Sequence, residues 1–235
     1  MQLFFNKSIQ ETDLDFTFDK QESRHIVRVL RKTEGDVLNI TNGRGTLFIC
    51  EIILASDKKC LVQIKEIQQQ QKEWNYSIHI AIAPTKLNDR FEWFLEKATE
   101  IGVDEITPII CDHSERKVIK LDRMEKIIHT AAKQSLKYYF PKLNPAIKLS
   151  EFINTKQSGT LLIAHCEETH KTTLKSVLKK SENYTVLIGP EGDFSTKEIA
   201  LALQHKYIPV SLGTSRLRTE TAGIVAVHSV AFTNE

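Results

Sequence analysis

After about residue 73, short apolar runs alternate with longer amphipathic segments, and this alternation constrains the fold more than any other feature of the chain. The runs of strand length are 78–83, 106–110, 161–164, 185–188 and 208–212. The segments with helical periodicity are 89–101, 121–137, 172–180, 196–205 and 220–232. Nearly continuous apolar strands that alternate with helices are typical of a parallel sheet covered on both faces. We therefore predict an α/β fold for residues 73–235, with Pro108 and Pro209 at edge positions or strand ends, because proline lacks the amide donor of a central strand.

Residues 1–70 are predicted to form a separate, mostly β domain that resembles a small barrel. The apolar runs 37–40 and 46–52 flank the glycine-containing turn 42–45, and the run 60–64 alternates apolar and polar residues. One short helix is expected over 22–32. The segment 68–73 is polar and has no apolar anchor, so we interpret it as a linker.

Composition excludes several classes of protein. The 32 basic and 30 acidic residues give a net charge of +2, which by itself does not indicate a nucleic-acid partner. No apolar run approaches the roughly 18 residues of a membrane span, and the first residues lack the pattern of a signal peptide. The four cysteines (Cys50, Cys60, Cys111 and Cys166) form no CxxC pair. We therefore expect buried thiols in a reducing cytoplasm, with no metal site and no disulfide.

The junction after the run 185–188 has unusual chemistry. In a parallel sheet, ligands bind where strands end and helices begin. Here Ile188 is followed by Gly189-Pro190-Glu191-Gly192, in which two glycines allow close backbone approach and proline stiffens the turn. Ser195 and Glu198 form a capping box for the next helix. A tight structural turn would explain the first glycine and the cap, but it would not require the acids at 191 and 193.

A second junction, over 212–219, leads from a strand into a helix rich in small residues. Arg218 lies close to the N-terminus of that helix, an end that favours anions, so Glu220 or an anionic ligand should pair with it. Arg216 could be an ordinary solvated loop charge. The small residues Ala222, Gly223 and Ala226 would allow close packing against another backbone, including one across a subunit interface. The patterns GxxxxGK[ST], GxGxxG, GxSxG and HExxH are absent from the sequence, which argues against the nucleotide and hydrolase sites that they indicate.

Together these motifs resemble a known enzyme superfamily. The segments 97–103, 188–192 and 217–222 occur in the order and with the spacing of the SPOUT superfamily of S-adenosylmethionine-dependent RNA methyltransferases, and the segment 25–31 resembles the PUA-like domain of one family in it. That family methylates N3 of a uracil in 16S rRNA. The resemblance implies an N-terminal PUA-like domain over 1–70, a SPOUT domain over 73–235 with a C-terminal trefoil knot, and a homodimer that acts on the small ribosomal subunit.

The resemblance also implies a cofactor site and its residues. The two loops would cradle S-adenosylmethionine, largely through backbone groups. The implied cofactor residues are Ile188, Gly189, Pro190, Glu191, Gly192, Leu212, Gly213, Leu217, Arg218, Thr219 and Ala222. The chain departs from the family at 133–137, where a glycine and an arginine are replaced by Leu136 and Lys137.

The chemistry of this reaction defines three catalytic candidates. Uracil N3 carries a proton on the pairing edge of the base, so the base must be unpaired and the proton must leave. Arg218 can stabilise the resulting anion but stays protonated and cannot act as the base. Glu191 or Glu220 could accept the proton, and the sequence does not distinguish them.

RNA binding is assigned to two basic regions. Arg24, Arg28 and Arg31, with His25 between them, would share one face of the helix expected over 22–32. The second region contributes Arg116, Lys133 and Lys137. Either region could instead be a solvated charged surface. Two further alternatives remain open, namely a SPOUT methyltransferase with another nucleotide or ribose 2′-oxygen target and a non-catalytic RNA-binding assembly factor.

Overall fold

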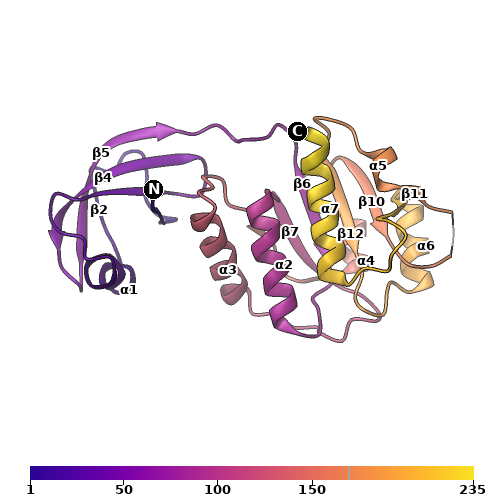
Figure 1. The fold of residues 1–235 in the computed structure, drawn as a ribbon. Coiled ribbons are helices and arrows are strands. Elements are labelled where there is room, and N and C mark those ends of the chain that lie inside the picture. The colour runs from indigo at the N-terminus through magenta and orange to yellow at the C-terminus, as the bar shows by residue number, and fades with distance from the viewer. Residues whose placement is uncertain (169) are drawn as a thin grey trace. The chain divides into compact units, whose positions relative to one another are not determined.

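The computed structural model describes residues 1–168 and 170–235, which divide into two compact units. The first unit contains Met1–Glu73 and Ala132–Phe140, and the second contains Trp74–Ala131 and Pro141–Glu235 (Figure 1). The first unit therefore includes a segment that lies far beyond residue 70 in the sequence. Among the described residues, no helix is both long and apolar enough to cross a membrane.

The first unit is built on a mixed five-stranded sheet. Its strands are β1 (Leu3–Phe5), β2 (Asp15–Thr17), β3 (Val37–Thr41), β4 (Thr46–Ala55) and β5 (Cys60–Gln69). They pair in the order β1-β3-β4-β5-β2, and only the β1–β3 pair is parallel. Phe4, Ile26 and Phe48 are buried in its core. The expected linker begins too early, because β5 continues to Gln69, which pairs with Thr46.

The turn between β3 and β4 explains why residues 132–140 belong to the first unit. Gly45 has a φ of 94°, and a side chain there would overlap the ring of Tyr139. The Gly45 amide donates to the carbonyl of Tyr138 at 2.9 Å, and the Phe140 amide donates to the carbonyl of Gly43 at 3.0 Å. The two glycines thus provide the space and the backbone conformation for this contact.

The second unit contains the predicted α/β fold. Its strands are β6 (Ile78–Ile82), β7 (Glu105–Ile110), β8 (Lys142–Leu143), β9 (Ile147–Lys148), β10 (Thr160–Ala164), β11 (Thr172–Thr173), β12 (Tyr184–Ile188) and β13 (Ile208–Ser211). They pair in the order β11-β13-β10-β12-β6-β7-β8, β9 also pairs with β7, and every pair is parallel. The helices are α2 (Asn88–Ile101), α3 (Leu121–Gln134), α4 (Leu149–Asn154), α5 (Leu174–Val177), α6 (Thr196–Gln204) and α7 (Thr219–Asn234), and the end of α3 from residue 132 onward belongs to the first unit. The α/β prediction is confirmed, whereas the trefoil knot stays a prediction.

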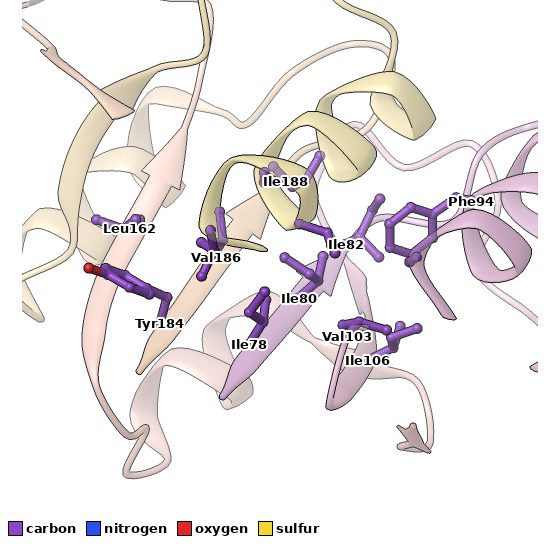
Figure 2. Packing of buried hydrophobic residues seen from close by; sticks show 14 of the residues in the cluster. Ile78, Ile80, Ile82, Phe94, Val103, Ile106, Leu162, Tyr184, Val186 and Ile188 are labelled. Atoms are coloured by element: carbon purple, nitrogen blue, oxygen red, sulfur yellow. The ribbon is translucent and has the colours of Figure 1, made fainter. Parts of the chain in front are cut away.

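Alternating residues of the central strand β6 pack on opposite faces of the sheet. Ile78, Ile80 and Ile82 belong to a core that includes residues of α2, α3 and α7 (Figure 2). Ala81 belongs to a second core, formed with residues of α4 and α6. Helices thus cover both faces, as near-continuous apolar strands require.

The two prolines lie where a neighbouring strand is missing on one side. Pro108 pairs with Ile82 of β6, but it falls between the residues of β7 that pair with β8 and those that pair with β9. Pro209 pairs with Ile163 of β10, and it lies just before the two residues of β13 that pair with β11. The missing amide donor is therefore tolerated at both positions. The helix expected over 172–180 is shorter than predicted, because α5 spans only Leu174–Val177.

Candidate functional site

Two adjoining cavities open at the carboxyl ends of β10, β12 and β13. The first, of about 330 Å³, is lined by Ala164, Cys166, Ile188, Gly189, Pro190, Glu191, Asp193, Arg216, Leu217, Arg218, Thr219 and Ala222. The second, of about 350 Å³, is lined by Ala164, His165, Cys166, Lys171, Val210, Ser211, Leu212, Gly213, Thr214, Ser215, Arg216, Leu217 and Ala222. The two loops singled out in the sequence therefore meet in space. Of the eleven residues implied for the cofactor, ten line these cavities and Gly192 does not.

A buried hydrogen bond joins the two loops. The hydroxyl of Thr219, the first residue of α7, donates to the carbonyl of Gly189 at 3.0 Å. Arg216, Leu217 and Ala222 line both cavities, so the second loop forms the wall between them. The conformation of each loop thus depends on the other.

The loop after β12 is also held from outside the cavities. His113 Nδ1 lies 3.1 Å and 3.0 Å from the carbonyl oxygens of Gly192 and Asp193. A side chain at position 192 would come within 3.1 Å of His113, so Gly192 serves this packing rather than the cavity wall. The predicted capping box is confirmed, with Ser195 and Glu198 in reciprocal hydrogen bonds at the start of α6. The loop is therefore fixed at both ends.

The segment after β10 completes the cavities and was missed by sequence analysis. Ala164, His165 and Cys166 line one or both of them, and the Cys166 amide donates to the Asp193 carboxylate at 2.7 Å. The sequence signal that could have found this segment is its position directly after the apolar run 161–164, at the end of a predicted strand. Cys166 is exposed, so the prediction that all four thiols are buried is wrong at this position. Both ring nitrogens of His165 are buried and have no hydrogen-bond partner among the described residues, and burial lowers its pKa.

Arg218 is the residue that stands immediately before α7, with its side chain exposed. Within residues 1–168 and 170–235, its guanidinium takes part in no hydrogen bond or ion pair. Glu220, which was expected as a possible partner, is buried, and its Oε1 lies 3.8 Å from Nε of Arg90 on α2. A cation at this electropositive helix end is therefore available to an anionic ligand.

The two carboxylates proposed as proton acceptors differ in position. Glu191 is exposed and lines the first cavity, and its Oε1 accepts the backbone N–H of Lys86 at 2.9 Å. Glu220 lines neither cavity, and its Oε2 is buried with no hydrogen-bond partner in the described part of the chain. The geometry thus places Glu191, and not Glu220, at the cavity.

The small residues of α7 pack within the chain. A side chain on Gly223 would come within 2.6 Å of Phe94 on α2 and 2.9 Å of Ile82 on β6. Ala226 is fully buried in the same core. The close packing expected of these small residues is thus found within the chain for Gly223 and Ala226, and packing across a subunit interface stays a prediction.

The three arginines expected on one helix face in the first unit are not all part of the helix. The helix α1 (Lys20–Arg24) continues as a π-helix, η1 (His25–Val29), whose i→i+5 bonds change the spacing of side chains. Arg31 lies beyond the helix with a φ of 56°. Arg24 is exposed, Arg28 pairs with Asp57 at 2.9 Å, and His25 lies 3.1 Å from Glu22. The predicted stripe of three arginines is wrong in its geometry.

Two of the three residues of the second basic region form hydrogen bonds or ion pairs within the protein. Arg116 donates to the carbonyl of Lys86 and to Asn88, which fixes the turn before α2. Lys137 pairs with Glu73 at 2.8 Å and its side chain is only 14% exposed. Lys133 is half-buried near the end of α3. Arg116 and Lys137 therefore have structural partners, which weakens their assignment to RNA.

The cavities fit a ligand of the size and chemistry of S-adenosylmethionine. Each lies in the range of about 300–1,000 Å³ typical of small-molecule sites. Apolar side chains of Ile188, Leu212 and Leu217 stand beside loop backbone, and acidic Glu191 and Asp193 can face a cationic sulfonium group. Gly213 has a φ of 143° and open space where a side chain would be, so the backbone there is accessible. Within the described residues, no group of three or more His, Cys, Asp or Glu residues is placed to hold a metal ion.

Comparisons with known proteins agree with this geometry. Residues 72–231 match the model of the RNA methyltransferase domain family, and residues 18–65 match that of the RNA methyltransferase PUA domain. A Buchnera aphidicola protein named ribosomal RNA small subunit methyltransferase E is 31% identical, covering 92% of this chain and 89% of that protein.

Two solved structures are similar over the whole chain. A probable rRNA methyltransferase from Porphyromonas gingivalis is 42% identical with a TM-score of 0.92, covering 100% of this chain and 98% of that one. A putative methyltransferase from Legionella pneumophila, solved with its cofactor SAM bound, is 28% identical with a TM-score of 0.88, covering 99% and 97%.

Proposed function

The chain belongs to the RNA methyltransferase family whose domain spans residues 72–231, and we propose that it transfers a methyl group from S-adenosylmethionine to N3 of a uridine in 16S rRNA. The relative named ribosomal RNA small subunit methyltransferase E and the SAM-bound structure support the substrate class and the cofactor. We propose that the enzyme acts in the cytoplasm on the small ribosomal subunit.

One observation carries this proposal: the two loops are tied together by Thr219 and Gly189 and line a shared pair of cavities at the carboxyl ends of the strands. We propose that residues 188–191 and 212–219, with Ala222, hold the cofactor there. When bound, it supplies an electrophilic methyl group on sulfur, which keeps the electron pair of the broken bond. The chain then needs only to orient an RNA base and to manage one proton.

The charged side chains at the cavity can manage the proton of uracil N3. A neutral imide nitrogen is a poor nucleophile, so the N3 proton must leave before or during transfer. In our proposal the Glu191 carboxylate accepts this proton, because it lines the cavity, whereas Glu220 does not. The Arg218 guanidinium, which has no partner among the described residues, stabilises the negative charge on the uracil ring, and N3 forms the new bond to carbon.

The structure offers an indirect argument for a homodimer. The helix α7 buries Gly223, Ala226 and Val230 against its own chain, but Phe232 on another face is 66% exposed. A helix that is apolar on several sides is normally covered on all of them. We propose that a second copy covers the exposed face, which light scattering of the full chain would test.

Two measurements test the proposed reaction. Isothermal titration with S-adenosylmethionine should give saturable binding, and no binding at high micromolar concentration would favour a non-catalytic assembly factor. Mass mapping of 16S rRNA from a deletion strain should then reveal the loss of one base methyl on a uridine. Loss of a methyl from a ribose, or from another base, would favour a related methyltransferase with a different target.

A further inference from the structure

A third cavity on the second unit, of about 420 Å³, is surrounded by lysines from three separate elements. Lys117 follows β7, Lys148 ends β9, and Lys197 lies in the first turn of α6. The remaining described lining residues are Ile110, Cys111, Asp112, Ser150, Glu198 and Leu201. None of these residues lines either cofactor cavity. It is therefore a separate site.

The two acids of this cavity are occupied by protein donors. Glu198 is buried, its Oε1 accepts the backbone N–H of Asp112 at 2.9 Å, and its Oε2 accepts that of Ser195 at 2.8 Å. The Asp112 carboxylate accepts the hydroxyl of Ser195 at 2.6 Å. Neither acid pairs with a lysine of the cavity.

The three lysines have no such partners among the residues that the structure describes. Within the described parts of the chain, none of their ammonium groups forms an ion pair or a side-chain hydrogen bond, and all three residues are exposed. The three ammonium groups outnumber the two carboxylates of the lining, which leaves a formal net charge of +1, and only the ammonium groups lack partners among the described residues. Such an arrangement opposes folding slightly and attracts an anion.

We infer that this cavity binds a backbone phosphate of the RNA substrate, an inference that rests on the proposed function. Lysine binds phosphate as a point charge and does not read the base, which suits a contact that positions an RNA strand. The Asp112–Ser195 hydrogen bond connects the cavity wall to the loop that contains Gly189 and Glu191. A phosphate held here is thus fixed to the same unit, and to the same loop, as the proposed methyl-transfer site.

The test compares two triple variants of the full chain. Lys117→Gln, Lys148→Gln and Lys197→Gln together remove the lysines of the cavity. The matched control is Lys126→Gln, Lys175→Gln and Lys206→Gln, which removes the same charge from exposed positions of the same unit. For the cavity variant we expect the KM for small ribosomal subunits to rise about tenfold and the slope of log Kd against log salt for a 16S rRNA fragment to shrink by about one or more. S-adenosylmethionine affinity should stay unchanged.

Three outcomes would overturn the inference. One is an equal effect of both triple variants on RNA affinity, because net charge alone would then explain it. Another is an unchanged salt slope in the cavity variant. In the third, millimolar inorganic phosphate stabilises the wild-type protein against heat but not the cavity variant, and the variant still binds RNA normally. The cavity would then be a site for free phosphate. A wild-type protein that does not methylate the subunit would refute the proposed function. The RNA-binding assay needs no turnover, so it would still test whether the cavity binds phosphate.

Discussion

Charged side chains line a cavity at each end of the parallel sheet. The cation at the carboxyl end has no acidic partner among the described residues, whereas the charges at the amino end are paired with one another. At the carboxyl end, Arg218 lines a cavity and contacts no acid among the described residues. At the amino end, a cavity of about 680 Å³ is lined by His79, Glu105, Lys142 and Asn144, among others, and these are bonded to one another. Charges that are paired within the chain stabilise the fold, and unpaired charges at a cavity indicate a ligand.

The amino-end network is closely connected. Asn144 donates to Glu105 and to the Thr107 hydroxyl at 2.7 Å each, and Lys142 donates to Glu105 at 3.0 Å. His79 Nε2 lies 2.7 Å from the same hydroxyl. Burial alone would raise the pKa of Glu105, but the hydrogen bonds from Asn144 and Lys142 outweigh it and leave that pKa below its usual value.

The largest expected effect is the loss of turnover in Arg218→Ala. If the guanidinium stabilises the developing anion, kcat should fall by about 100-fold or more, as for the loss of one preorganised donor. The free energy of unfolding should change by less than about 0.5 kcal/mol, because the Arg218 side chain is exposed and has no partner within residues 1–168 and 170–235. Single-turnover kinetics and titration with S-adenosylmethionine separate the two steps. Equal losses in turnover and cofactor affinity would instead make Arg218 a cofactor ligand only.

Asn144→Ala should show the opposite pattern at the amino end. The variant removes one donor from Glu105, which keeps its bond from Lys142, and one from the Thr107 hydroxyl, which keeps His79 as a neighbour. We therefore expect the free energy of unfolding to fall by about 1–3 kcal/mol. Turnover and cofactor affinity should stay at wild-type values, since Asn144 lines neither cofactor cavity. Urea unfolding and steady-state assays measure both. A loss of activity without a loss of stability would show that the amino end also binds a ligand, and the comparison would fail.

The sequence was sufficient to locate the two loops that line the cavities, because their signals are local. Glycine and proline at the end of an apolar run, with a capping box behind them, identify a strand-to-helix junction within about ten residues. The parallel order of the sheet then requires such junctions to lie at one edge. This reasoning found the loops at 188–192 and 212–219 but not the third one at His165 and Cys166, which has no glycine and no cap.

The pairing of charges could not be predicted from the sequence, because it depends on residues that are distant in the chain. Arg116 contacts Asn88, Lys137 contacts Glu73, and Glu220 lies near Arg90, and no local pattern encodes any of these pairs. The short strands β8, β9 and β11 are likewise stabilised only by their neighbours in the sheet. The π turn at His25–Val29 removed the helical spacing on which the arginine stripe depended.

The smallest expected effect concerns the pH dependence of stability through His79. Its side chain is only 12% exposed, and burial lowers its pKa in the folded protein although Glu105 lies 3.9 Å away and opposes this shift. Between that lowered pKa and the unfolded value of about 6.5, the unfolded chain binds the extra proton, so stability falls as pH falls, by at most about 1.4 kcal/mol per pH unit. His79→Gln should remove this part of the slope in urea unfolding between pH 7 and pH 5, while the similarly shifted His165 keeps its own part. Glu105 stays ionised in the folded protein across this window because its pKa lies below the usual value. An unfolded glutamate has a pKa of about 4.3, so Glu105 adds only a small slope at the pH 5 end. If the free energy of unfolding has the same pH dependence in the variant and the wild type, His79 binds protons equally in the folded and unfolded states. The amino-end network would then not hold His79 neutral.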